Sequence, residues 1–236
     1  PPTIKCIEAA RGGLDHTLME KVVANKPISV SLLKVQYRMN ESIMRFPSEW
    51  FYNNQLESAP EIRQRGILDF DTPMIWIDTS EMECHEEFVG ESFGRINKPE
   101  ANLLLQELES YIQKIGENRV LDEQIDFGLI SPYKAQVQYL RNKIKSSSFF
   151  RRFRPLITVN TVDGFQGQER DVIFISLVRA NESGQIGFLN DLRRMNVAIT
   201  RARMKLVILG NATTLTKHTF YHKLMEYIQK ETVIRS

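Results

Sequence analysis

The stretch "RRMNVAITRARMKLVILG", Arg193 to Gly210, joins two patterns that together indicate the fold. Residues 191–199 place apolar side chains at helical spacing, and residues 206–209 form an apolar run typical of a strand buried on both faces. A helix that leads into such a strand favours a sheet covered by helices. Arg201 and Arg203 lie where the helix passes into the strand. Three interpretations are open: a nucleic-acid patch, a salt-bridged helix end, or arginines directed at phosphate.

The rest of the chain repeats this alternation of strand and helix. Short apolar runs rich in β-branched residues predict strands, and helical spacing of apolar residues predicts helices. The expected strands are 28–35, 74–78, 125–130, 156–162, 172–178 and 206–209, and the expected helices are 99–115, 134–144, 191–199 and 215–228. The pattern predicts an α/β fold with a mostly parallel sheet flanked by helices.

The helix near Pro99 has a well-marked start. Asn97 can cap it, Pro99 stands where a missing N–H costs nothing, and Glu100 is three residues after the cap, as a capping box requires. The acidic run "SEMECHEEFVGESFG", residues 80–94, interrupts the periodicity. We therefore expect a mobile surface loop there.

Composition limits the class of protein. The chain has 236 residues, of which 42% are hydrophobic, enough for one large α/β domain. With 31 basic and 29 acidic residues, no whole-chain field would attract a polyanion, so a nucleic-acid site must be a local cluster. Cys6 and Cys84 match no zinc or redox spacing, and neither a signal peptide nor a membrane-length apolar stretch is visible. We expect an intracellular protein without a membrane partner, in the cytoplasm, or in the nucleus of a eukaryote.

The sequence lacks the usual signature of a complete triphosphate site. It has no G-x-x-x-x-G-K-[ST] loop, whose amides, lysine and hydroxyl hold phosphates and magnesium, and no strand that ends in paired Asp-Glu. His218 and His222 are four residues apart without a third ligand, so no metal site is predicted. The chain alone is not expected to hydrolyse ATP.

Two further segments carry polar chemistry next to strands. "VQYRMN", residues 35–40, directly follows a predicted strand, and we expect it at that strand's carboxyl end, where α/β sheets bind ligands. "TVDGFQGQERDVIFISLVR", residues 161–179, places a turn between two strands. Gly164 and Gly167 permit close backbone approach there, and Glu169 offers a carboxylate.

These segments carry a family resemblance. "QYRM", "TVDGFQGQERDVI" and "MNVAITRAR", in this order, resemble motifs IV, V and VI of superfamily 1 helicases, in the branch of senataxin and the nonsense-mediated-decay helicase. "PPTIKC" resembles the tail of that family's motif III, and "LISPYKAQVQYLR" resembles the turn before motif V. The resemblance implies a RecA-like P-loop NTPase fold: residues 1–30 would be the motif III tail and connection, and residues 31–236 the second RecA-like domain of a longer protein.

The resemblance also implies roles for individual residues. Arg38 and Arg201 match arginine fingers that reach the γ-phosphate, where planar, permanently charged donors are needed. Tyr37, with Gln36 beside it, matches a position that stacks on the nucleotide base. Glu169 matches the residue that bonds the ribose hydroxyls, and Gly167 would offer its N–H to phosphate. The alternatives are surface ion pairs for the arginines, a core position for Tyr37 and a local pair with Arg170 for Glu169.

A second set of residues is expected to hold the nucleic-acid strand. Backbone amides and small hydroxyls at strand ends suit phosphate contacts that do not depend on sequence. The candidates are Ser131, Pro132 and Tyr133 in "SPY", and Thr161 and Asp163 in motif V. The alternative for "SPY" is a helix N-cap followed by proline at the first helical position.

The resemblance implies an ATP-dependent helicase that moves 5′ to 3′ on single-stranded DNA or RNA. Its cofactors would be ATP and Mg²⁺, with the magnesium ligands on a first RecA-like domain, which would also be a partner of this chain. Two alternatives stay open. One is the opposite-polarity branch of the same superfamily, which shares a similar "ALTRAR". The other is a nucleic-acid-binding scaffold whose helicase core has lost activity.

Overall fold

The structure is a computed structural model, and it describes residues 8, 22, 25, 31–83, 85–90 and 94–235. The chain divides into two compact units, Pro1–Val35 and Gln36–Ser236. The motif-based division at residue 30 stays a prediction. Residues 28–30 of the first expected strand lie outside the described residues, and residues 31–34 are not in a strand, so this expectation is wrong there. The second unit is the subject of all that follows.

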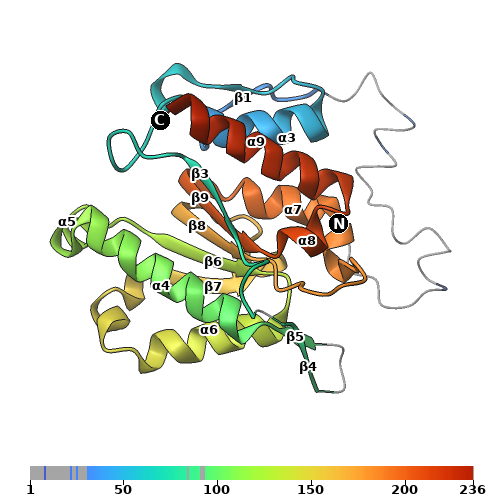
Figure 1. Cartoon of the computed structure of the whole chain (residues 1–236). Coiled ribbons are helices and arrows are strands. Elements are labelled where there is room, and N and C mark those ends of the chain that lie inside the picture. Colours follow the sequence, from blue (N-terminus) through green and yellow to red (C-terminus); the bar gives the residue numbers. More distant parts are fainter. Residues whose placement is uncertain are drawn as a thin grey trace. The chain divides into compact units, whose positions relative to one another are not determined.

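A parallel sheet forms the centre of the second unit. In the described part of the chain it consists of β3 (Met74–Asp78), β6 (Phe127–Ser131), β7 (Ile157–Thr161), β8 (Arg170–Ser176) and β9 (Ala202–Gly210). Their order across the sheet is β3-β9-β8-β6-β7, and all neighbouring strands run parallel. The predicted α/β fold with a mostly parallel sheet is confirmed (Figure 1).

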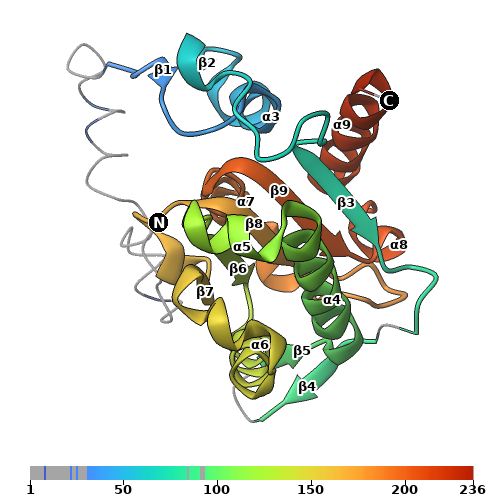
Figure 2. The ribbon, with the colours of Figure 1, turned by 90° about the vertical axis from the view of Figure 1, so that its left-hand side faces the viewer.

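Helices cover both faces of this sheet (Figures 1 and 2). One core contains residues of α3 (Glu41–Tyr52), α7 (Leu192–Ile199), α8 (Ala212–Leu215) and α9 (Thr219–Arg235), and the other contains residues of α4 (Lys98–Ile115), α5 (Glu117–Asp122) and α6 (Lys134–Ser146). Along β9, Leu206 and Ile208 enter the first core, while Val207 and Leu209 enter the second. Because successive side chains alternate between the faces, a strand covered on both sides must be apolar throughout.

The remaining elements are short, and at two places they differ from what the sequence predicts. The expected helix over residues 215–228 is interrupted after α8, and α9 begins at Thr219. The acidic stretch expected to be a loop contains β4 (Glu87–Val89), which pairs antiparallel with β5 (Gly94–Ile96). The other short elements are β1 (Val35–Gln36), β2 (Glu57–Ser58), η3 (Pro60–Ile62), η4 (Phe149–Arg152), η5 (Arg154–Leu156), η6 (Asp163–Phe165) and η7 (Gly187–Asn190).

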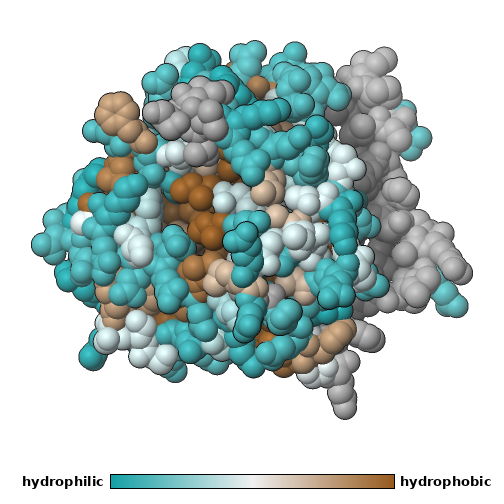
Figure 3. Space-filling view, in the orientation of Figure 1, coloured by the Kyte–Doolittle hydropathy of each residue, from teal (hydrophilic) through white to brown (hydrophobic). Residues whose placement is uncertain are grey.

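The surface in the view of Figure 3 is largely hydrophilic, with a small hydrophobic area close to β3. Buried hydrophobic residues instead gather in the two cores on either side of the sheet. Within the residues that the structure describes, no helix is both long and apolar enough to cross a bilayer.

A buried polar network fixes the start of α4 against the end of β8. Asn97 caps the helix as predicted, because its side chain accepts from the Glu100 N–H at 3.0 Å. The second half of the expected capping box is wrong. The Glu100 carboxylate turns away from the cap and accepts from the Ser176 hydroxyl and, at 2.8 Å, from the Val178 N–H. Gln136 accepts from the Asn97 N–H in its place, at 2.9 Å.

This network also holds an uncommon backbone conformation. Val178 has φ 70°, which is unfavourable for a β-branched residue. Its N–H donates to Glu100, and its carbonyl accepts from the Asn97 side chain at 3.2 Å. Glu100 is fully buried, and this burial raises its pKa to about 7 although the bonds from Ser176 and Val178 act in the opposite direction.

The Glu100→Gln variant is expected to change the pH dependence of stability. Between the ordinary carboxyl pKa of 4.5 and about 7, folded wild-type protein keeps a proton that the unfolded chain releases. The free energy of unfolding of the wild type therefore falls as pH rises through this window, by about 3 kcal/mol at most. Glu100→Gln should lose this decline, whereas Glu109→Gln, at a partly exposed position of α4, should keep it. Denaturant unfolding from pH 4.5 to 8 measures the difference, and parallel curves for wild type and Glu100→Gln would contradict it.

Candidate functional site

The candidate residues lie at two opposite edges of the sheet. Arg201 directly precedes β9 and Glu169 directly precedes β8, so both belong to the edge where the strands begin, named here the amino edge. Arg38 joins them there, because its side chain contacts Glu169 and the Thr200 carbonyl. The expectation that residues 35–40 lie at the carboxyl end of a sheet strand is wrong. Their short strand β1 is outside the five-stranded sheet.

At the amino edge, Arg38 is held by two partners. Its Nε forms an ion pair with the Glu169 carboxylate, and its guanidinium also donates to the Thr200 carbonyl, 3.1 Å away. Glu169 is shared, because Arg203 lies 3.3 Å from its other carboxylate oxygen. Burial alone would raise the pKa of Glu169, but Arg38 and, at longer range, Arg203 and Arg65 outweigh it and lower that pKa. Glu169 is therefore ionised and surrounded by cations.

Arg203 is the most heavily paired arginine of the edge. Besides Glu169, it lies 3.1 Å from Asp171 and 3.6 Å from Asp126. Asp126 accepts from the Asp171 backbone N–H at 2.7 Å. Burial, and then the nearby Asp126, raise the pKa of Asp171. Arg203 thus stabilises a pair of carboxylates, which matches the ion-pair interpretation of its sequence position.

Arg201 is placed differently. Its guanidinium donates to the Val197 carbonyl at 2.9 Å, to the Gln168 carbonyl at 3.1 Å and to the Thr200 hydroxyl at 3.1 Å. Among the described residues it forms no direct ion pair with a carboxylate, and two of its five N–H groups are left over. Burial, and then repulsion from Arg38, lower its pKa. The arrangement is a fixed, half-buried cation that an anion would stabilise.

The other residues predicted to bind the nucleotide lie around the amino edge. Tyr37 is 67% exposed, so the alternative of a core position is wrong for it. The Gln36 side chain bonds within the chain: it accepts from the N–H groups of Arg38 and Met39 and donates to the Met39 carbonyl and to Ser58. It therefore shapes the loop that carries Arg38. Gly167 is exposed, with φ 83°, and an added Cβ would meet open space. Contacts of all three with a nucleotide stay predictions.

Two residues that sequence reasoning missed complete the amino edge. Asn40 is buried, caps α3 by accepting from the Ser42 N–H at 2.9 Å, and donates its own N–H to the Arg203 carbonyl at 2.8 Å. Arg65 donates to the Arg38 carbonyl. An Asn directly before an acidic first turn is a recognisable helix-start signal, whereas Arg65 follows a 3₁₀ turn without any periodic pattern.

The predicted strand-binding residues lie at the opposite edge, where the sheet strands end. Ser131 and Thr161 are register partners at the ends of β6 and β7. The Ser131 hydroxyl is buried and accepts from the Tyr133 N–H at 3.4 Å. The Thr161 hydroxyl accepts from the Gly164 N–H at 3.3 Å. Both hydroxyls therefore hold turns at the carboxyl edge.

Three further candidates flank these hydroxyls. Helix α6 begins at Lys134 with Tyr133 as its N-cap, so the alternative in which Pro132 is the first helical residue is wrong. Asp163 is exposed and lies 3.5 Å from Arg194. The structure brings this predicted set together, and its contact with nucleic acid stays a prediction.

Residues 162–169 connect the two edges. They leave β7 at its carboxyl end and enter β8 at its amino end, and β6 lies between these two strands. Phe165 anchors the segment because its ring is fully buried in the core. The ring fits because residue 128 is glycine: an added Cβ would lie 2.9 Å from it. Phe165 therefore anchors the middle of the segment that joins Thr161 to Glu169, whereas Asp163, Gln166 and Gly167 are exposed.

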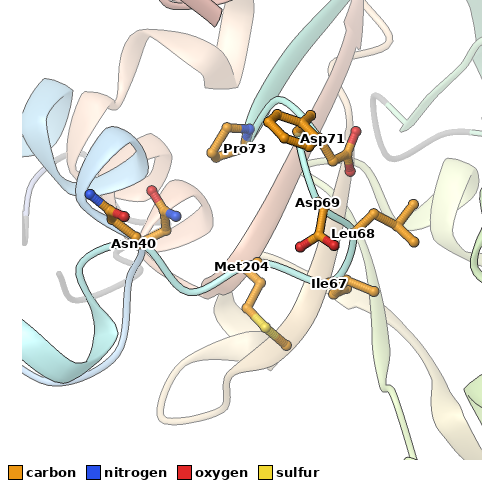
Figure 4. A pocket seen from close by; sticks show the side chains of 10 residues that line it. Asn40, Ile67, Leu68, Asp69, Asp71, Pro73 and Met204 are labelled. Atoms are coloured by element: carbon orange, nitrogen blue, oxygen red, sulfur yellow. The ribbon is translucent and has the colours of Figure 1, made fainter.

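A cavity of about 510 Å³ lies beside the amino edge, between Asn40 and residues 66–71 (Figure 4). Two aspartates line it, Asp69 and Asp71. Asp71 lies 3.0 Å from Lys205 and accepts from the Tyr111 hydroxyl at 2.7 Å. Burial would raise the pKa of Asp71, but Lys205 and then Tyr111 outweigh it and lower the pKa. The pair explains how Lys205 can be buried in a strand whose other buried residues carry no charge.

Metal-binding residues are not clustered in the described part of the chain, where no group of three or more His, Cys, Asp or Glu could hold an ion. His218 accepts from the Phe220 N–H at 3.2 Å, and His222 lies 3.4 Å from Glu226. Cys84 is outside the described residues.

The parallel sheet, the arginine-rich amino edge and the ordered series of motifs define a RecA-like domain of the superfamily 1 helicase class. Comparison with known proteins gives the family: residues 14–213 match the family model AAA_12, described as "AAA domain", and the chain belongs to this family. The predicted likeness to the helicases of the senataxin and nonsense-mediated-decay branch is confirmed.

The relatives agree with this assignment. The chain is 35% identical over 240 residues to the Regulator of nonsense transcripts 1 homolog of Drosophila melanogaster, covering 99% of the chain and 20% of that protein. It is 35% identical over 232 residues to an uncharacterized ATP-dependent helicase of Methanocaldococcus jannaschii, covering 96% of the chain and 33% of that protein. It is 33% identical over 230 residues to Helicase sen1 of Schizosaccharomyces pombe, covering 96% and 13%. The chain thus spans a third or less of the length of each of these relatives.

Replacing Glu169 with Gln should destabilise the amino edge electrostatically. Arg38 and Arg203 would lose their shared carboxylate, and the free energy of unfolding near neutral pH should fall by about 1 kcal/mol, with a smaller loss at high salt. Since the pKa of Glu169 is lowered in the folded state, its contribution is present above the ordinary carboxyl pKa and disappears as pH falls through the lowered one. Denaturant unfolding at two salt concentrations and several pH values measures this, with the exposed Glu61→Gln as control. A loss that is independent of both salt and pH would show that packing, not charge, is responsible.

Proposed function

We propose that this chain is the second RecA-like half of an ATP-dependent helicase that moves 5′ to 3′ along single-stranded DNA or RNA. In this proposal a first RecA-like domain holds ATP and Mg²⁺, and Arg201 and Arg38 contact the γ-phosphate across the cleft between the domains. The observation that carries the proposal is the state of Arg201, a half-buried guanidinium fixed by backbone carbonyls without a direct carboxylate partner among the described residues.

Electrostatics favours a phosphate at this position. Burial and then repulsion from the nearby Arg38 lower the pKa of Arg201, and attraction to Glu169 offsets only part of this effect. A γ-phosphate would relieve this repulsion and use the two N–H groups that Arg201 keeps free of described partners. Charge on the transferring phosphoryl group increases in the transition state, and arginine fingers contribute about 10³- to 10⁵-fold in rate. Arg201, already oriented, needs little reorganisation to act.

The remaining nucleotide contacts follow from the same edge. The exposed ring of Tyr37 is free to stack on the base, and the Glu169 carboxylate accepts from the ribose hydroxyls. Glu169 is also the ion-pair partner of Arg38, so ribose binding and release of Arg38 toward phosphate are linked. The open space around Gly167 allows its N–H to approach a phosphate oxygen. The magnesium ligands are expected from the first domain.

The strand lies at the carboxyl edge in this proposal. Ser131, Pro132, Tyr133, Thr161 and Asp163 contact its backbone without reading sequence. Because Phe165 anchors residues 162–169 in the core, we expect closure of the domains around ATP to shift both edges together. Repeated closure and opening then move the strand, as expected of a conformational cycle driven by hydrolysis.

Arg201→Ala tests the catalytic role in a protein that carries this domain together with a first domain bearing the G-x-x-x-x-G-K-[ST] loop. ATP hydrolysis stimulated by nucleic acid should fall by about 10³-fold or more, with nucleotide binding largely kept. Arg201→Lys should recover little, because an ammonium cannot reproduce the planar fork. The matched control is Arg193→Ala, an exposed arginine of α7 that pairs with Asp191. Steady-state hydrolysis with fluorescent-nucleotide binding measures both quantities, and turnover near the wild-type rate would refute the role.

The isolated chain and the direction of movement give two further readouts. The chain of 236 residues alone should hydrolyse ATP no faster than a buffer control. Hydrolysis at a helicase-like rate would show that the second half does not need the first.

On substrates with a single-stranded 5′ or 3′ tail, the two-domain protein should displace only the strand consistent with 5′-to-3′ movement. The reverse preference would favour the opposite-polarity branch, and stable binding without hydrolysis would favour the scaffold.

A further inference from the structure

A cavity of about 700 Å³ lies at the carboxyl edge. Of the residues predicted to contact a ligand, Tyr133 alone lines it. Its walls come from the β4–β5 hairpin, the start of α6, the turn after β8 and η7. The residues that matter for its chemistry are Phe88, Arg95, Tyr133, Arg179, Gly187 and Phe188. We name this cavity the edge cleft. Its volume is within the range of sites that hold small organic groups.

Two aromatic side chains of the edge cleft are open to solvent. Phe88 is 64% exposed and Phe188 is 55% exposed. Behind them the Tyr133 ring is buried, with its centroid 5.7 Å from that of Phe188. Aromatic side chains are usually buried because exposing them to water is unfavourable. Two exposed rings on one cavity therefore indicate a surface that a flat, apolar group would cover.

The edge cleft carries one positive charge in excess, from two arginines and one glutamate. Arg95 lies 2.7 Å and Arg179 lies 2.6 Å from the same residue, Glu86, so two guanidinium groups share one carboxylate. The Arg95 guanidinium also lies over the Phe88 ring, 3.8 Å from its centroid. Stacked guanidinium and aromatic planes are a common surface for nucleobases.

The walls of the edge cleft are held in place from behind. Arg179 follows Val178, whose strained backbone is fixed by Glu100 and Asn97. Gly187 has φ 56°, and a Cβ there would collide with the Arg179 guanidinium. Glycine at 187 therefore lets the chain pass directly over Arg179. A rigid wall reduces the entropy that ligand binding would cost.

We propose that the edge cleft is a base-stacking subsite, in which one nucleobase of a single-stranded nucleic acid lies against Phe88 and Phe188. The inference rests on the proposed function, because it assigns the strand to the carboxyl edge at Tyr133. It adds a contact to the base, whereas the residues proposed there contact the strand's backbone. Stacking does not depend on base identity, so the subsite would hold the strand without selecting a sequence.

The test compares strands with and without bases. The full chain is titrated into fluorescein-labelled oligo(dT), oligo(U) and an abasic strand of the same length, and anisotropy gives Kd at several salt concentrations. Phe88→Ala and Phe188→Ala should each weaken binding of both base-bearing strands by about 5- to 150-fold, the range expected for loss of one stacked base. Binding of the abasic strand, and the slope of log Kd against log salt, should not change, because phosphate contacts are kept. Phe188→Trp should keep the affinity of the wild type, because it replaces one stacking ring with another. Phe70 is 98% exposed and lies outside the cleft, so Phe70→Ala should have no effect.

Other results of this titration would contradict the subsite or restrict it. If the wild type binds base-bearing and abasic strands equally, or if both alanine variants bind oligo(dT) and oligo(U) as the wild type does, the edge cleft takes no base. If the variants lose affinity for the abasic strand as well, their effect is on the fold or on phosphate contacts, and the subsite is again refuted. If the wild type binds none of the strands, the subsite is refuted for this chain, whereas the proposed function is decided separately by hydrolysis stimulated by nucleic acid in the two-domain protein. Equal losses on DNA and RNA are expected, and a loss confined to one would assign the subsite to that nucleic acid.

Discussion

The amino edge of this domain depends on one carboxylate placed among arginines. Glu169 holds Arg38 and Arg203, which come from two segments that lie far apart in the sequence. Arg203 carries the main-chain contact to Asn40, the residue that starts α3, so the same edge also fixes how the Arg38 loop enters its helix. Without a carboxylate at 169, Arg38 and Arg203 would lose the negative charge that they share, and repulsion between the guanidinium groups of this edge would increase.

Glu169 does not neutralise all the arginines of the amino edge. The remaining positive charge is what would allow this edge to bind an anion. Arg203 is matched by Asp126 and Asp171, whereas Arg201 is bonded to carbonyls and a hydroxyl. Carbonyl oxygens orient a guanidinium without neutralising it, so Arg201 stays a net cation in a partly desolvated place. Such a group costs stability in the absence of a ligand. In the proposed function, this loss of stability is the cost of holding Arg201 oriented for a phosphate.

The sequence was sufficient for the five sheet strands but not for every element. Apolar runs placed these strands, because the central ones are covered on both faces, whereas α3 and the β4–β5 pair were not expected. Residues 35–40 were assigned to the wrong edge because a two-residue strand outside the sheet looks locally like a sheet strand. Glu100 was expected to bond back to the cap, a local contact, but its partner lies 78 residues away in sequence. Long-range partners such as Arg65 for Arg38, or Asp71 for Lys205, leave no periodic trace.

The two edges are linked by the sheet itself. Strands β6, β8 and β9 are almost entirely buried, so a displacement at their beginnings reaches their ends with little loss. Residues 162–169 add a second route, since they cross from one edge to the other and are pinned at the middle by Phe165 against Gly128. Thr161 at one end and Glu169 at the other therefore cannot move independently without disturbing a fully buried ring. In the proposed function, the sheet and this anchored segment are the parts of the domain that link an anion at the amino edge to a strand at the carboxyl edge.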